Sequence, residues 1–156
     1  MGYGGKSPGP GIRCMKGDKV FLDTNLLLYA FDAGSPAKHL VAVRILEGLW
    51  KSGDGILSTQ VLQEFFVNVT KKIPNPLSVT VGREIVDDFL KWRIVPIEGR
   101  TILRAIDLHE KHKYAFWDSL VIQSAIDGGA KWLFSEDFRD GQKIGDLTIR
   151  NPFLHE

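Results

Sequence analysis

Four acidic residues interrupt apolar stretches of this chain, and their side chains are the ones best suited to chemistry. They lie in the segments FLDTNLL, LQEFFV, AFWDSLVI and WLFSEDF, and they are Asp23, Glu64, Asp118 and Asp137. A carboxylate removed from water costs several kcal/mol unless hydrogen bonds or a cation compensate it. Carboxylates that converge also repel one another, which raises their pKa values. The pattern therefore indicates either a hydrogen-bonded network or a cation site.

The residue types favour a hard divalent cation over zinc. Mg²⁺ and Mn²⁺ prefer oxygen ligands, whereas zinc sites use clustered Cys and His. The histidines are scattered without such spacing, at His39, His109, His112 and His155. A cation held by carboxylates activates water and stabilises negative charge, which suits hydrolysis, most naturally of a phosphodiester. Thr24, Asn25 and Ser135 stand beside the acids and could orient them, bind water or contact phosphate.

Each acidic residue also has a simpler structural interpretation. Asp23 suits the N-cap of the helix that follows it, and Asp118 suits the positive end of a helix dipole. Glu64 could be a solvent-facing helix residue, and Asp137 and Asp140 could be surface charges of a loop. Taken singly, these interpretations are preferred. The site hypothesis depends on all four acids meeting at one edge of the fold.

Short apolar strands alternate with helices along the whole chain. Strands are expected at residues 20–22, 55–57, 93–95, 131–134 and 147–149, and helices at 25–31, 35–50, 60–72, 79–91, 101–111 and 116–126. A polar loop, SEDFRDGQKIGD, precedes the last strand. This alternation predicts an α/β fold with a mainly parallel sheet and helices on both faces. Ligands of such sheets bind at the carboxyl ends of the strands, where the acids are expected.

Size, charge and cysteine content limit the other interpretations. The 156 residues suit one domain, and the net charge of +1 means that any contact with nucleic acid needs a local patch. A single cysteine, Cys14, excludes an internal disulfide framework and fits a reducing cytosol. No apolar run reaches the ~18 residues of a membrane span. Residues 1–17, rich in Gly and Pro, are expected to be a flexible tail before a domain at 18–156, and Met15 could begin the natural chain.

The acidic segments resemble those of the PIN-domain nucleases. The likeness is carried, in order, by LDTN at 22–25, QEFF at 63–66, WDSLVIQSA at 117–125 and LFSEDFRDG at 133–141. It runs from about Val20 to Phe153, and the order and spacing of the segments make it specific. Within the family, the chain is most similar to the compact VapC-type toxins of toxin–antitoxin pairs. The segment LTIRNPF at 147–153 adds to this likeness.

The resemblance implies a three-layer α/β/α sandwich and a ribonuclease that depends on Mg²⁺ or Mn²⁺. The catalytic and metal-binding acids that it implies are Asp23, Glu64, Asp118 and Asp137. Ser135 matches the small hydroxyl residue before the last acid, Glu136 is expected to be an outer-shell group, and Asp140 matches a weaker acidic position. The implied partners are an RNA substrate, a second copy in a homodimer and a cognate antitoxin, in the cytoplasm and without a membrane.

Contacts with RNA would need positive charge or aromatic faces near the acids. The cationic candidates are Lys38, Arg44, Lys71, Lys72 and Lys111 to Lys113, although solvated helix ends explain several of them equally well. Tyr114, Phe116 and Trp117 could stack on bases, with core packing the preferred role for Phe116 and Trp117. Some apolar residues of the first two helices could form a dimer or antitoxin surface, although ordinary core packing is the safer interpretation for any one of them. These residues are Leu27, Leu28, Phe31, Val41 and Leu49.

Other functions fit the sequence less well. Phosphatases of the haloacid dehalogenase type need a second Asp two positions after the first, and Asn25 stands there. No G-x-G-x-x-G follows the first strand, which disfavours a dinucleotide-binding enzyme. A non-catalytic RNA-binding or regulatory module on the same fold is the remaining alternative. The intact acids disfavour it, and failure to bind a divalent cation would support it.

Overall fold

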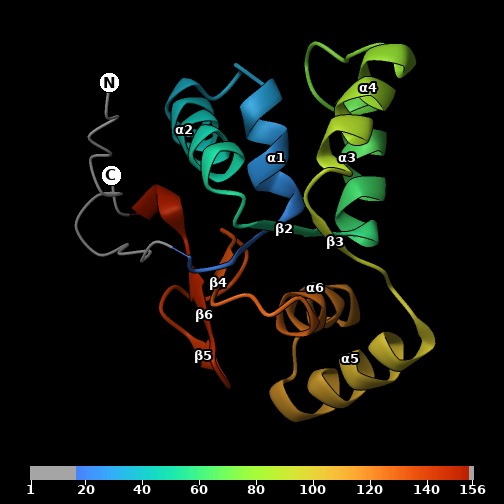
Figure 1. The fold of residues 1–156 in the computed structure, drawn as a ribbon, viewed down its shortest axis with the longest axis vertical. Coiled ribbons are helices and arrows are strands. Elements are labelled where there is room, and N and C mark those ends of the chain that lie inside the picture. Colours follow the sequence, from blue (N-terminus) through green and yellow to red (C-terminus); the bar gives the residue numbers. More distant parts are fainter. Residues whose placement is uncertain (1–16, 155–156) are drawn as a thin grey trace.

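The computed structural model describes residues 17–154 and contains one six-stranded sheet with helices on both faces (Figure 1). The order of the strands in the sheet is β3-β2-β1-β4-β6-β5, and every neighbouring pair is parallel except β5 with β6. The strands are β1 Val20–Leu22, β2 Gly55–Ser58, β3 Arg93–Val95, β4 Trp132–Phe134, β5 Lys143–Ile144 and β6 Leu147–Arg150. The expected sandwich with a mainly parallel sheet is confirmed. The expected tail lies outside the described residues except for Gly17.

Six α-helices form the two outer layers of the described chain. They are α1 Thr24–Phe31, α2 Pro36–Ser52, α3 Thr59–Lys71, α4 Val79–Phe89, α5 Gly99–His112 and α6 Phe116–Asp127, and a 3-10 turn, η1, follows at Pro152–Leu154. Helices α1 to α4 lie on one side of the sheet, and α5 and α6 lie on the other (Figure 1). Within the described chain, no helix is long and apolar enough to cross a membrane.

The sheet reverses its direction of growth beside β1, and this reversal positions the site. The chain passes from β1 outward to β2 and β3, and then returns across the other face to β4 on the opposite side of β1. The carboxyl ends of β1 and β4 are neighbours, because Leu22 pairs with Phe134 and the Asp23 amide donates to the Phe134 carbonyl at 3.1 Å. Parallel sheets bind ligands in the crevice at such a point.

Local signals set most of the element boundaries. Ser58 ends β2 and caps α3, because its hydroxyl accepts a hydrogen bond from the Val61 amide at 3.2 Å. Ser78 caps α4 in the same way through the Val81 amide. Helix α5 begins two residues earlier than expected, since a capping box joins Glu98 to Thr101.

One strand lies where the sequence predicts only loop. The polar segment before β6 contains β5, which pairs with β6 through Ile144 and Leu147. Ile144 and Phe138, the two large apolar residues of this polar segment, are both buried, so burial of apolar side chains holds the segment against the core. Gly145 has a φ of +58°, a conformation that glycine adopts at little cost in the short turn between the two strands.

The apolar residues of the first two helices, for which core packing was preferred over a partner surface, belong largely to the core. Leu27, Val41 and Leu49 are buried, and Leu28 and Phe31 are partly buried against the same cluster. The surface hypothesis is therefore wrong for the three buried residues, and the core interpretation is right for them. These side chains of α1 and α2 pack within the protein and are not free to form a separate surface.

Candidate active site

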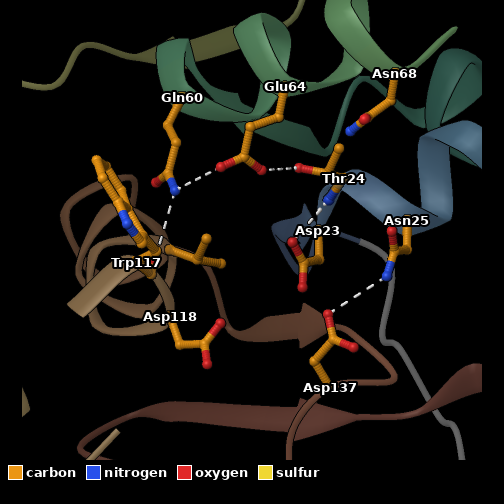
Figure 2. Close-up of a pocket in the computed structure, with 10 residues that line it drawn as sticks. Asp23, Thr24, Asn25, Gln60, Glu64, Asn68, Trp117, Asp118 and Asp137 are labelled. Carbon is orange, nitrogen blue, oxygen red and sulfur yellow. Dashed lines mark hydrogen bonds between the residues drawn. The ribbon is translucent and has the colours of Figure 1, made fainter. Parts of the chain in front are cut away.

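All four predicted acids line one pocket at the carboxyl edge of the sheet. Asp23 follows β1, Glu64 lies on α3, Asp118 lies in the first turn of α6, and Asp137 follows β4. Figure 2 shows the carboxyl groups turned toward a common space, with Glu64 facing the other three acids. The cavity has a volume of about 130 Å³. The fold therefore brings together side chains that are up to 114 positions apart in the sequence.

Asp23 is held firmly at the base of this pocket. Its Oδ1 accepts a hydrogen bond from the Thr24 amide at 2.7 Å, and its Oδ2 accepts one from the Ser135 hydroxyl at 2.7 Å. The same Ser135 oxygen accepts a hydrogen bond from the Asp137 amide at 3.1 Å. Asp23 is thus the N-cap of α1, as its simpler interpretation predicts, and also part of the acidic group. Ser135 fixes two of the acids relative to each other.

Glu64 is oriented by neutral donors on both of its oxygens. The Thr24 hydroxyl donates to Oε2 at 2.7 Å, and the Gln60 amide donates to Oε1 at 3.0 Å. Hydrogen bonds to a charged acceptor are stronger than those between neutral groups. The Glu64 carboxylate is therefore fixed by hydrogen bonds on the face of α3 that lines the pocket. Its interpretation as a solvent-facing helix residue is wrong.

Asp118 and Asp137 are less constrained than the other two acids. Among the described residues, no hydrogen-bond donor contacts the Asp118 carboxylate. Within residues 17–154, the one donor to the Asp137 carboxylate is the side-chain Nδ2 of Asn25, at 3.5 Å, a distance at which a hydrogen bond is weak. The oxygens of both groups are available to water, a cation or a substrate.

Burial and mutual repulsion raise the pKa values of two of these carboxyl groups. Burial raises the pKa of Asp23 from its ordinary value of 3.8 to about 6, although the hydrogen bonds from Ser135 and Thr24 oppose the shift and the charges of Asp137 and Glu64 add to it. The pKa of Asp118 is also raised, first by burial and then by the charges of Asp137 and Glu64. No Lys or Arg of the described chain lines the pocket to offset this repulsion. A bound cation would offset it.

The oxygen-rich lining fits a hydrated hard cation better than a fully enclosed one. Within residues 17–154, no three His, Cys, Asp or Glu side chains are grouped tightly enough to surround a metal ion. Mg²⁺ needs no such cage, because it keeps several of its waters and uses one or two carboxylates. Asp118 and Asp137, with their loosely engaged oxygens, have the donor chemistry for direct or water-mediated ligands.

Two of the predicted supporting residues lie away from the pocket. Glu136 turns to α1 and α2, where its carboxylate accepts hydrogen bonds from the Tyr29 hydroxyl at 2.6 Å and the Lys38 ammonium at 2.7 Å. Asp140 accepts a hydrogen bond from the Asn151 amide at 3.0 Å, near the end of β6. Of the remaining supporting residues, Thr24 and Asn25 line the pocket, and Ser135 lies beneath it.

The pocket includes two polar residues that the sequence pattern did not single out, and one aromatic residue for which core packing was the preferred role. Gln60 and Asn68 lie four positions before and after Glu64 on α3, and Trp117 precedes Asp118 on α6. Residues four apart share one face of a helix, so the spacing of Gln60, Glu64 and Asn68 was a usable signal. The sequence favours core packing over base stacking for Trp117, whereas 65% of its surface is exposed. The core interpretation is wrong.

The fold, the order of the acids and the family model agree. The PIN-domain model matches residues 20–143, which is most of the chain. This protein belongs to the PIN-domain family. A comparison with curated proteins finds no match.

Several solved structures share this fold, and each is a toxin or a toxin–antitoxin complex. A toxin–antitoxin complex from Klebsiella pneumoniae aligns with a TM-score of 0.63 at 18% identity, over 86% of this chain and 98% of the other. VapC20 of Mycobacterium tuberculosis, a toxin that cleaves the sarcin–ricin loop, aligns with a TM-score of 0.60 at 21% identity, over 76% and 92%. VapBC2 of Rickettsia felis, bound to a fragment of its promoter DNA, aligns with a TM-score of 0.59 at 20% identity, over 84% of this chain and 96% of the other. The expected likeness to VapC-type toxins is confirmed as one of fold.

Proposed function

We propose that this PIN-domain protein is an endoribonuclease that hydrolyses RNA phosphodiester bonds with Mg²⁺ or Mn²⁺. The observation that carries the proposal is the convergence of four carboxylates on one pocket of a PIN fold. The raised pKa values of Asp23 and Asp118 support it, because uncompensated acids at one edge of a sheet are costly unless a cation joins them.

The residues of the pocket would have different roles in such a reaction. Asp118 and Asp137 would hold the cation, with Asp23 and Glu64 as its further carboxylate neighbours. When bound, the cation supplies an activated water and stabilises the charge that develops on the phosphate. Ser135 and Thr24 keep Asp23 and Glu64 in place through hydrogen bonds of 2.7 Å. This rigidity preserves the spacing of the site, which catalysis requires.

The biological setting that we propose is that of a toxin–antitoxin pair. The structures with the same fold include a toxin that cleaves the sarcin–ricin loop and toxins bound to their antitoxins. By this likeness, the protein would act on RNA in the cytoplasm, form a homodimer and be inhibited by a cognate antitoxin. A non-catalytic module on the same fold is the competing function, and it requires the acids to be inert.

The direct test is cleavage of a panel of structured RNAs with Mg²⁺ or Mn²⁺. Wild-type protein is expected to cut at least one RNA, to stop in EDTA and to recover when the cation is restored. The Asp118→Asn variant, purified in parallel, controls for contaminating ribonucleases and should be inactive. Cleavage that persists in EDTA would contradict the metal mechanism, and equal cleavage by both proteins would assign the activity to a contaminant.

A further inference from the structure

The exposed indole of Trp117 at the edge of the acidic pocket points to a nucleobase subsite. We infer that Trp117 stacks on an unpaired base next to the phosphate that is cut. This inference rests on the proposed ribonuclease function and deepens it, because it specifies RNA whose bases are unpaired at the cleavage site.

Trp117 is exposed for a reason that lies in the geometry of α6. The helix buries every residue from Ser119 to Ala125, whereas Trp117 stands two residues earlier, in the first turn and beyond the edge of the core. Its ring contact among the described residues is with its neighbour Phe116, at a centroid distance of 5.2 Å and edge to face. Leaving an indole 65% exposed forfeits hydrophobic stabilisation that burial would give. The folded chain thus gains less from this side chain than it would from a buried one.

The size of the pocket places the bases of a substrate outside it. A volume of about 130 Å³ is well below the ~300–1,000 Å³ of sites that enclose a small-molecule ligand. The pocket can therefore take a phosphate group and a hydrated cation, and the flanking nucleosides must lie on its rim. Trp117 is on that rim, adjacent to Asp118 in the chain and beside it in Figure 2.

The backbone beneath the indole is attached to the acidic side chains. The Gln60 amide that donates to Glu64 also lies 3.5 Å from the carbonyl oxygen of Trp117. The indole is thus carried by a helix end that is tied to the pocket, and a base on its face would be positioned relative to the carboxylates. A stacked base can in this way orient the scissile phosphate.

The charge of the pocket favours an aromatic contact with the bases. The pocket contains four acids and no Lys or Arg of the described chain, so it repels an RNA backbone until a cation binds. Stacking on an aromatic side chain contributes roughly 1–3 kcal/mol per base and is independent of the backbone charge. It also tolerates any base, because each has an aromatic face. A paired base in a duplex is already stacked on its neighbours and is not free for this contact.

Binding measured with a short unstructured RNA tests the subsite. The protein carries Asp118→Asn, so that the RNA is not cut, and Mn²⁺ is present throughout. Adding Trp117→Ala should weaken binding of the single strand by roughly 5- to 150-fold, which corresponds to the loss of about 1–3 kcal/mol. Trp117→Phe should restore most of the affinity. Binding of the same RNA annealed to its complement should not change with Trp117→Ala.

Abasic substitution shows whether a base meets this side chain. One abasic position in the RNA should reproduce the loss in the protein that retains Trp117 and should add nothing to the Trp117→Ala loss, as expected for two partners of one contact. Binding of the intact RNA should quench tryptophan fluorescence, and Trp117→Phe should remove the quenching. Trp50→Phe is the matched control, because Trp50 is also exposed but packs on Phe89 and Trp92, away from the pocket.

Several results would overturn the subsite. They are unchanged affinity of the Trp117→Ala protein for the single strand, an equal loss on the duplex, or abasic losses that add fully to the Trp117→Ala loss. A protein that cuts RNA but shows one of these results keeps the ribonuclease function and loses the stacking platform. Wild-type protein that neither cuts nor binds any RNA would overturn both.

Discussion

The Asp23 carboxylate serves the fold and the proposed chemistry with the same two oxygens. It caps α1, receives the Ser135 hydroxyl and lies with three other acids. Its pKa of about 6 shows that the hydrogen bonds do not fully offset burial. Stability is thus reduced at this position above pH 6 in the absence of a cation, as at other functional sites that oppose folding.

The Asp23→Asn variant should therefore be more stable than wild type at neutral pH. The pKa of Asp23 is higher in the folded state than its ordinary 3.8, so the folded state binds more protons and the free energy of unfolding falls as the pH rises from about 4 to 6. Above pH 6 the full penalty applies, and its removal should stabilise the variant by about 3 kcal/mol at most. Urea unfolding of both proteins in EDTA between pH 4 and 8 measures the difference. A gain in stability that does not grow with pH would contradict this.

Asp118→Asn should separate activity from stability. Burial and the charges of Asp137 and Glu64 raise the pKa of Asp118, so a neutral amide should raise the melting temperature measured in EDTA at pH 7.5. RNA cleavage should fall by at least about 100-fold, the scale of losses at catalytic groups. A variant that melts well below wild type would assign a structural role to Asp118.

Ser135→Ala should lower both the stability of the fold and the affinity of the acidic group for a cation, because Ser135 contacts both Asp23 and Asp137. The variant loses a donor to a buried carboxylate, which should cost about 1.5–3 kcal/mol in urea unfolding at pH 7.5. Affinity for Mn²⁺ should fall roughly 10- to 100-fold, as for other residues that orient metal ligands. The matched control is Ser124→Ala, since Ser124 is equally buried but donates to the Leu120 carbonyl within α6. Equal Mn²⁺ affinity of the two variants would exclude the orienting role of Ser135.

At the scale of elements, the loop after β4 carries the last acid and is held from outside the pocket. Glu136 in this loop accepts hydrogen bonds from Tyr29 of α1 and Lys38 of α2, and the ring of Phe153 in η1 packs edge to face on Tyr29. Lys38 also lies 4.9 Å from the Tyr29 ring centroid. Lys38 is therefore engaged within the protein, and its proposed role as an RNA contact is not supported. The contact joins two helices to the loop that places Asp137.

Lys38→Met should weaken Mn²⁺ binding and cleavage by about 10-fold, because the loop of Asp137 loses its outer support. The control is Lys19→Met, because the Lys19–Asp54 ion pair resembles the Lys38–Glu136 pair but lies at the amino ends of β1 and β2. The N–O distance is 2.9 Å in the Lys19–Asp54 pair and 2.7 Å in the Lys38–Glu136 pair. The Lys and acid side chains are 46% and 13% exposed in the first pair, and 40% and 18% exposed in the second. Both Lys38→Met and Lys19→Met should cost only about 0–1 kcal/mol of stability. If Lys19→Met impairs cleavage as much as Lys38→Met, the effect is general and the positioning role is wrong.

At the scale of the whole molecule, the sequence predicts the layers and the acidic edge, but not the contacts between distant segments. Strand β1 and the acids are recognisable because a buried strand needs a continuous apolar run and a charge beside it stands out. The exposure of Trp117 is not recognisable, since polar and apolar residues alike are buried along α6 and no periodic pattern marks where its buried part begins. The pairing of Lys38 with Glu136, 98 positions apart, depends on how the sheet closes.

Titration of the protein with Mn²⁺, followed by the relaxation of water protons, tests the central claim most directly. Four carboxylates at one edge of the sheet should bind Mn²⁺ in wild-type protein, and Asp118→Asn should weaken that binding by at least about 10-fold. Lys19→Met, far from the pocket, should bind as wild type does. If wild-type protein binds no Mn²⁺, or if Asp118→Asn leaves the binding unchanged, the acidic pocket is not the cation site and the proposed mechanism is wrong.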